Sequence, residues 1–158
     1  MKECSLLASQ RWLKDLAEGI TSHELEALTL HGLLIVEAHK GFIRCKFIVP
    51  DCVSDENGNW HVGAMATLID DVGAAAIYSS VGHVKATLEF NVSYFSTAKI
   101  QEEVEIEANV VGDKGRLASV LVEVRRSDNG HLVALGAAAD IGLSSIAWFI
   151  YPHSKARP

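Results

Sequence analysis

The stretch from Val62 to Val81 contains no proline, and its alanine, methionine, leucine and isoleucine residues recur at spacings that suit a helix. Turn residues, Asn57-Gly58-Asn59, come shortly before it. Its only charged residues are Asp70 and Asp71. A helix with so little polar surface is buried on nearly every side. The pattern therefore predicts one long central helix around which the rest of the chain is organised.

Apolar and polar residues alternate on both sides of this helix, as they do in half-buried strands. Strands are predicted at Leu33–Ala38, Phe42–Val49, Ala86–Tyr94, Val104–Val110, Leu117–Arg125 and His131–Leu143. The predicted apolar face of the third strand consists of Leu88, Phe90, Val92 and Tyr94. His39-Lys40-Gly41 and Asn129-Gly130 are typical of tight turns between strands. The first two strands are therefore predicted to form a hairpin, and the last three an antiparallel meander.

Two shorter helices are predicted before the strands. Apolar residues form one stripe along Ser5–Glu18, and Gly19 then ends that helix. Thr21 with Glu24 matches a capping box, which predicts a second helix over Ser22–Leu28. The chain is thus expected to comprise an N-terminal helical segment (1–32), one domain (33–143) and a C-terminal tail (144–158) with an apolar run at 146–151.

The order of the predicted elements lacks the strand–helix–strand alternation of parallel sheets. It favours the α+β class, with a single antiparallel sheet wrapped around the long central helix. Such a sheet leaves its edge strands and its outer face in need of cover. We therefore expect a homo-oligomer, either a dimer or a tetramer.

Composition narrows the classes of function. A chain of 158 residues fits one domain with a core sufficient for stability. A net charge of -6 argues against a general nucleic-acid binder, and no apolar stretch reaches the roughly 20 residues of a membrane span. Three cysteines without CxxC spacing indicate neither a disulfide framework nor a metal site. A reducing, cytoplasmic location is the simplest expectation, with an organelle left open.

The two acids of the central helix lie on different faces. The face of Asp70 carries mostly small residues: Gly63, Ala66, Thr67, Gly73, Ala74 and Ile77. The face of Asp71 is bulkier and more typical of packing. A buried carboxylate is costly without a partner or a task, so the small face of Asp70 indicates room for a ligand. The same face would also let a strand or second helix approach closely, with Asp70 paired locally.

The segment GNWHVGAMATLIDDVGAAA, followed by TLEFNVSYFSTAKI, resembles the hotdog-fold acyl-CoA thioesterases of the phenylacetic-acid-pathway and acyl-CoA thioesterase 13 type. The resemblance covers about Leu33–Leu143. It implies the hotdog fold and the hydrolysis of acyl-CoA thioesters to free acid and coenzyme A, without metal or cofactor. The catalytic positions that it implies are His61, Val62, Gly63, Asp70 and Thr87. The implied substrate-binding positions are Asp55, Asn57, Asn91, Tyr94, Gly112, Lys114, Gly115 and Arg116.

Some positions depart from the family's pattern. Val62 replaces a glycine, and Asp55 replaces an asparagine that helps to orient the thioester carbonyl, a part that Asn57 or Asn59 could take. Gly136–Asp140, read as GAAAD, lacks the basic residues that relatives often carry there. Two other classes therefore remain open: a non-catalytic acyl-CoA-binding or scaffolding hotdog protein, and a dehydratase-like enzyme with His61 as its base.

Thioester hydrolysis needs a base or nucleophile and a donor for the carbonyl oxygen. Unpaired backbone N–H groups of Val62 and Gly63 at the helix start would suit the donor. Asp70 lies ~10 Å further along the helix axis, so it is expected to act on a carbonyl held by the helix start of a partner subunit. His61 could instead cap the helix.

Other residues of the implied site also have ordinary structural interpretations. Thr87 could be a plain strand residue, and Asp71 either a structural partner or the true base. Lys114 and Arg116 suit the phosphates of coenzyme A, but they could equally solvate the ends of strands.

Overall fold

The computed structural model describes residues 4–21, 23–84, 86–114 and 117–141. Its helices are α1 (Ser5–Ala17), α2 (Glu24–Thr29) and α3 (Val62–Val81), with a short 3-10 helix at Asp51–Val53. Its strands are β1 (Leu34–His39), β2 (Phe42–Ile48), β3 (Ala86–Tyr94), β4 (Glu103–Lys114), β5 (Leu117–Arg126) and β6 (Leu132–Ile141). The predicted end of the last strand and the apolar run at 146–151 lie outside the described residues.

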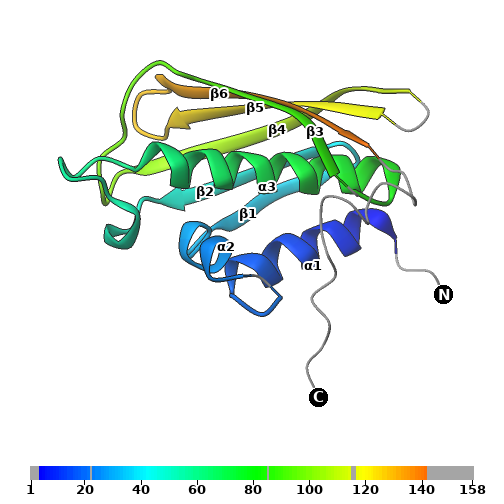
Figure 1. The fold of residues 1–158 in the computed structure, drawn as a ribbon, viewed down its shortest axis with the longest axis horizontal. Coiled ribbons are helices and arrows are strands. Elements are labelled where there is room, and N and C mark those ends of the chain that lie inside the picture. The colour runs from blue at the N-terminus through cyan, green and yellow to red at the C-terminus, as the bar shows by residue number, and fades with distance from the viewer. Residues whose placement is uncertain (1–3, 22, 85, 115–116, 142–158) are drawn as a thin grey trace.

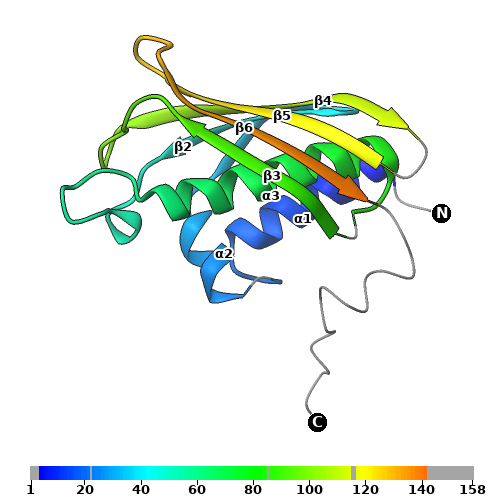
Figure 2. The same cartoon turned by 45° about the horizontal axis from the view of Figure 1, so that its top comes forward.

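All six of these strands form one antiparallel sheet in the order β1-β2-β4-β5-β6-β3. The sheet curves over α3, and α1 and α2 pack on the opposite side of that helix (Figures 1 and 2). The predicted hairpin is β1–β2, and the predicted meander is β4–β5–β6. The expected α+β architecture is therefore confirmed.

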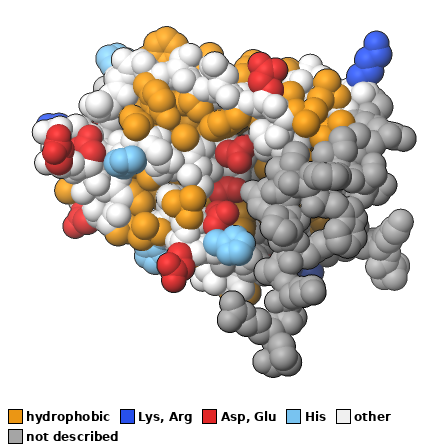
Figure 3. Space-filling view, in the orientation of Figure 1, with side chains coloured by type: hydrophobic (Ala, Val, Ile, Leu, Met, Phe, Trp, Pro, Cys, Tyr) orange, Lys and Arg blue, Asp and Glu red, His pale blue; other side chains and the backbone are white. Residues whose placement is uncertain are grey.

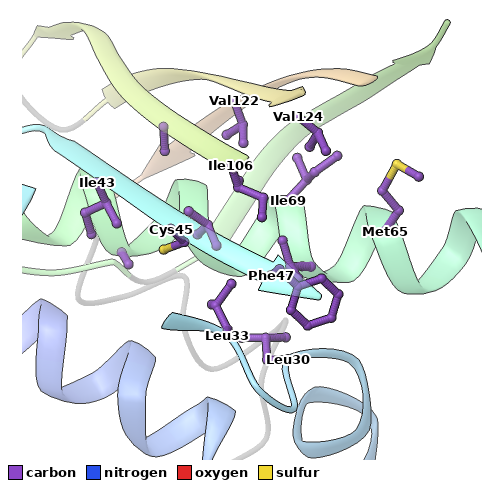
Figure 4. Close-up of a cluster of buried hydrophobic side chains, with 14 of the residues drawn as sticks. Leu30, Leu33, Ile43, Cys45, Phe47, Met65, Ile69, Ile106, Val122 and Val124 are labelled. Atoms are coloured by element: carbon purple, nitrogen blue, oxygen red, sulfur yellow. The ribbon is translucent and has the colours of Figure 1, made fainter. Parts of the chain in front are cut away.

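Helix α3 has the predicted bounds, and its burial explains its sequence. Its residues Met65, Leu68 and Ile69 are at most 1% exposed, because the sheet covers one side and the N-terminal helices the other. In Figure 4, Met65 and Ile69 project among side chains of the sheet. The helix ends at Gly82, whose φ of 82° is left-handed and suits glycine. Among the described residues, no helix is long and apolar enough to cross a membrane.

Alternation along the strands sorts residues between the core and the outer face. In β2, Ile43, Cys45 and Phe47 are at most 1% exposed and point towards α3. On the outer face, Arg44 forms ion pairs with Glu37 of β1 and Glu107 of β4. The pattern of two predicted for β2 is thus confirmed.

Two glycines let α3 approach the sheet closely. A Cβ atom added to Gly73 would meet methyl groups of Val120 and Val122 at 3.2 Å. One added to Gly136 of β6 would lie 2.4 Å from Cγ2 of Ile69. At Gly73, the helix face that carries Asp70 therefore packs against β5, as one of the two interpretations of its small residues predicted. No room is left there for a ligand.

The capping box predicted for the second helix is wrong. Helix α2 begins at Glu24, its N-cap is His23, and no side chain caps it. His23 has extended backbone angles, φ -72° and ψ 167°, directly before the first turn. Thr21 therefore lies too early in the chain for its hydroxyl to reach the free N–H groups of that turn.

The edge strand β3 keeps much of its apolar face exposed. Leu88, Phe90 and Tyr94 are 52%, 39% and 43% exposed. A β-bulge between Thr87 and Glu89 shifts the register of β3 against β6. The apolar face predicted for this strand is therefore left largely uncovered by the described part of the chain.

Candidate functional site

A cavity of about 350 Å³ lies beside the middle and C-terminal half of α3. Its lining residues come from α1, α3, the segment after α3, and β3: Trp12, Asp70, Asp71, Ala74, Tyr78, Gly82, His83, Val84, Ala86 and Thr87. The rings of Trp12 and Tyr78 make an edge-to-face contact with centroids 6.4 Å apart. The cavity therefore combines aromatic walls with two carboxyl groups and a hydroxyl.

Asp70 and Thr87, which the sequence placed in one site, do meet here. The Thr87 hydroxyl donates to Oδ1 of Asp70 at 3.4 Å, a long hydrogen bond. Burial raises the pKa of Asp70, and the hydrogen bond from Thr87 opposes that rise. A half-buried carboxylate with one weak donor keeps lone pairs for a water molecule or a substrate atom.

Asp71 lines the same cavity, although its helix face had suggested packing. Burial raises its pKa to about 8, and the charges of Asp70 and of Glu26 on α2 add to that rise. Its Oδ2 and the Oε2 of Glu26 both lack a hydrogen-bond partner among the described residues. Asp71 is therefore protonated at neutral pH, which suits a structural acid better than a base.

Replacing Asp71 by asparagine is expected to raise the melting temperature, and to raise it more as the pH increases. The folded protein holds the Asp71 proton up to a pKa of about 8, whereas the unfolded chain releases it near 3.8. The stabilisation that Asp71 contributes is thus fully present below pH 3.8 and is lost as the pH rises from 3.8 to about 8. The neutral amide removes that loss. Thermal melts across this pH range test it, and an equal difference at every pH would contradict it.

Asp140 was not among the predicted site residues. It is 3% exposed, and it pairs with Thr87 across the β3–β6 ladder. Burial raises its pKa to about 6, the charge of Asp70 adds to the rise, and the Thr87 hydroxyl opposes it. The available signal was a lone acid in a strand of small apolar residues. The pairing of β3 with β6 is what places this acid opposite Thr87, and the sequence alone does not report that pairing.

At the start of α3, the structure shows the capping role that was one of the two interpretations of His61. His61 is the N-cap of α3, and Nδ1 of that residue accepts the Gly63 N–H at 3.0 Å. The Gly63 N–H is therefore paired within the chain, which corrects the expectation that it is free for a carbonyl. The Tyr94 hydroxyl donates to the Val62 carbonyl at 2.9 Å and fixes β3 to this end of the helix.

The loop before α3 is held together by Asp55. Its Oδ1 accepts the N–H groups of Asn57 at 2.8 Å and Asn59 at 3.0 Å. These hydrogen bonds, that from Asn59 first, hold the pKa of Asp55 below its usual range. The carboxylate is thus engaged in shaping the loop.

Gly112 and Lys114, two of the predicted coenzyme A residues, are exposed at the end of β4, where the neighbouring Asp113 accepts a hydrogen bond from Ser80 at 3.3 Å. Asn91 is exposed on β3. Gly115 and Arg116 lie outside the described residues. Of the predicted site positions that the structure describes, Asp70 and Thr87 are the two that line the cavity.

On the face shown in Figure 3, hydrophobic side chains lie exposed between acidic ones, and few basic side chains are seen among the described residues. Within the same residues, no group of three or more His, Cys, Asp or Glu could hold a metal ion.

Comparisons with known proteins agree with this architecture. The family model of the thioesterase superfamily matches residues 57–133. A Caenorhabditis elegans protein provisionally named an esterase is 31% identical over 132 residues, which cover 83% of this chain and 76% of that protein. Human acyl-coenzyme A thioesterase 13 is 26% identical over 125 residues, covering 78% and 89%. The crystal structure of zebrafish thioesterase superfamily member 2 has a TM-score of 0.77 and 26% identity, covering 87% and 98%. The chain therefore belongs to the thioesterase superfamily and is a hotdog-fold thioesterase.

Proposed function

We propose that this thioesterase hydrolyses acyl-CoA thioesters to free acid and coenzyme A, with Asp70 as the base or nucleophile. The observation that carries the proposal is the half-buried Asp70 carboxylate, hydrogen-bonded by Thr87 at the wall of an aromatic-lined cavity. The human and mouse relatives named acyl-coenzyme A thioesterase 13 are 26% and 29% identical to this chain. Their names support coenzyme A thioesters as the substrate class.

In the base mechanism, Asp70 accepts a proton from a water molecule while the oxygen of that water attacks the thioester carbonyl carbon. The C–S bond then breaks, and the thiolate of coenzyme A leaves and takes up a proton. In the nucleophile mechanism, an Asp70 oxygen attacks the same carbon, the C–S bond breaks as an anhydride forms, and the thiolate leaves and takes up a proton. Water then cleaves that anhydride to the free acid and the Asp70 carboxylate. The raised pKa of Asp70 suits proton acceptance, because a more basic carboxylate is the better acceptor.

Thiol release from a panel of acyl-CoAs tests the proposal directly. The panel varies chain length and includes aryl-acetyl groups, and free acid is measured in parallel. We expect coenzyme A and acid in equal amounts. Ligand-induced melting shifts without thiol release would point instead to a binding protein.

We further propose that the site is completed by a second subunit. Asp70 lies ~12 Å along α3 from Val62, so one helix cannot offer both a base and an N–H donor at its start to one thioester. The edge strand β3 exposes Leu88 and Phe90, and one of its edges is unpaired among the described residues. Pairing with another copy of the chain would cover this edge and its apolar side chains, and it would bring a second helix start towards Asp70.

Light scattering at micromolar concentration is expected to show an oligomer, either a dimer or a tetramer. Phe90→Glu should shift it to monomer and abolish activity while retaining the circular dichroism of the folded chain. The control is Leu7→Glu, since Leu7 is 57% exposed and lies on helix α1 rather than on an edge strand. An active wild-type monomer would show that the site needs no partner.

The basic residues after β4 are expected to bind the coenzyme A portion of the substrate. Replacing Lys114 and Arg116 together by alanine should raise KM more than it lowers kcat, because these groups would contact a part of the substrate that does not react. Lys46→Ala is a suitable control, since Lys46 is paired with Glu103 at 3.3 Å on the outer face of the sheet. An unchanged KM would place coenzyme A elsewhere.

A further inference from the structure

Asp140 brings a third carboxyl group to the site, and the mechanism proposed above does not use it. Strand β6 places it directly across from Thr87 on β3. It is 3% exposed, and its Oδ1 has no hydrogen-bond partner among the described residues. A buried carboxyl group that is only partly hydrogen-bonded is costly to the fold. Its position beside the Thr87 hydroxyl therefore calls for an explanation.

Thr87 lies between two carboxyl groups and has one hydrogen to donate. That hydrogen is directed at Oδ1 of Asp70, at 3.4 Å. The hydroxyl also lies across the ladder from Asp140, and it opposes the rise in the pKa of that carboxyl group. A hydroxyl donates once but can accept as well. If Asp140 is protonated, it can donate to Thr87 Oγ1 while Thr87 donates to Asp70. If Asp140 is ionised, the two carboxylates compete for the same hydrogen.

We propose that Asp140 is a positioning residue for the hydrolysis: through the Thr87 hydroxyl it determines whether Asp70 meets the substrate as a hydrogen-bonded carboxylate or as a protonated acid. The inference rests on the proposed role of Asp70. It makes Asp70, Thr87 and Asp140 one titrating unit, in which a proton on Asp140 favours the ionised form of Asp70.

The groups that surround this unit leave Asp70 as the main charge facing Asp140. From α3, Asp70 is the charge that raises the pKa of Asp140 after burial itself. Asp71 also lies on α3 but is neutral at neutral pH, with a pKa of about 8. The neighbour of Asp140 in β5 is Ala118, which carries no charge. His83, in the segment after α3, lines the same cavity.

Asp140→Asn gives the decisive measurement. The amide cannot ionise, and its NH₂ group can donate to Thr87, which leaves the Thr87 hydrogen for Asp70. At low pH the wild-type Asp140 is protonated and donates to Thr87 as the amide does, so the acid limbs of the two kcat/KM profiles should coincide. The wild-type profile should carry a second inflection near pH 6, where Asp140 ionises and competes for the Thr87 hydrogen, and the variant should lack it. A purely structural Asp140 predicts two profiles of the same shape, with the variant less active by the same factor at every pH, and that result would overturn the proposal.

Two further variants separate the hydroxyl from simple charge repulsion. Asp71→Asn is the matched control, because Asp71 also borders Asp70 but stays protonated near pH 6; this variant should keep the second inflection. In a Thr87→Val background the second inflection should shrink, since only direct repulsion between the two carboxylates remains. An inflection of equal size with and without the hydroxyl would show that Asp140 does not act through Thr87.

A substrate-free measurement keeps this inference separate from the proposed function. In a carboxyl-carbon NMR titration of the wild-type chain, the Asp70 resonance should respond in two steps, one of them shared with Asp140. A single, independent step for each residue would overturn the proposal even if the enzyme is active. Shared steps in a protein that hydrolyses no acyl-CoA would support the coupling and refute the proposed function alone.

Discussion

Replacing Asp70 by asparagine is expected to lower kcat by about 100-fold or more, the usual contribution of a general base. The amide keeps the volume of the side chain and can still accept the Thr87 hydrogen bond, but it can neither take a proton nor form an anhydride. The melting temperature should not fall, because burial disfavours the charged form of Asp70 in the wild type. Steady-state kinetics on the best acyl-CoA of the panel, together with thermal melts, measure both quantities.

The matched control for this variant is Asp71→Asn. Asp71 is the adjacent residue of α3 and lines the same cavity, yet its pKa of about 8 keeps it protonated near neutral pH. We therefore expect its kcat to stay within a few-fold of the wild type at neutral pH. A fully active Asp70→Asn enzyme, or an inactive Asp71→Asn enzyme, would show that the base has been assigned to the wrong carboxylate.

Replacing Gly136 by alanine is expected to destabilise the fold by about 1–3 kcal/mol, the usual cost of overpacking a core. The added Cβ would lie 2.4 Å from Cγ2 of Ile69, whose side chain is 1% exposed and cannot move away freely. Helix α3 and strand β6 must therefore separate at this point. For a chain of this size the melting temperature falls by roughly 2–4 °C per kcal/mol, which thermal denaturation measures readily.

Two variants identify the cause of that loss. Leucine at position 69 lacks the Cγ2 methyl group, so Ile69→Leu should partly restore the stability of Gly136→Ala. Gly112→Ala is the control for backbone entropy, since a Cβ at Gly112 meets nothing within 4 Å. If Ile69→Leu gives no rescue, the close approach of α3 to β6 is not what requires glycine at position 136.

Much of the fold could be predicted from the residues because its signals are local. The spacing of apolar residues from Val62 to Val81 predicted the bounds of α3, which the structure confirms. Alternation of apolar and polar residues predicted the buried side of β2 in the same way. Such periodicity depends only on consecutive residues and on the geometry of the backbone. The Thr21 cap failed because the helix start depends on the backbone angles of His23, which no spacing reports.

The candidate site could be predicted only in part. A carboxylate in an apolar helix is costly wherever that helix packs, so Asp70 was visible in the sequence. The resemblance placed Thr87 beside it, and the hydrogen bond between them is observed. The engagement of the Gly63 N–H by His61 was one of two open interpretations, and only side-chain geometry could decide between them.

The sequence by itself thus determined the central helix, the strands and the choice of Asp70 and Thr87 as candidate site residues. Only the tertiary structure decided that β3 pairs with β6, which puts Asp140 opposite Thr87. It also decided that Gly73 and Gly136 let the sheet approach α3 closely, and that Asp71 is a half-buried acid whose pKa is raised to about 8. The physical reason is that burial, the pairing of strands and the pKa of a carboxyl group depend on which distant residues meet. Local patterns fix the faces of each element but not its neighbours.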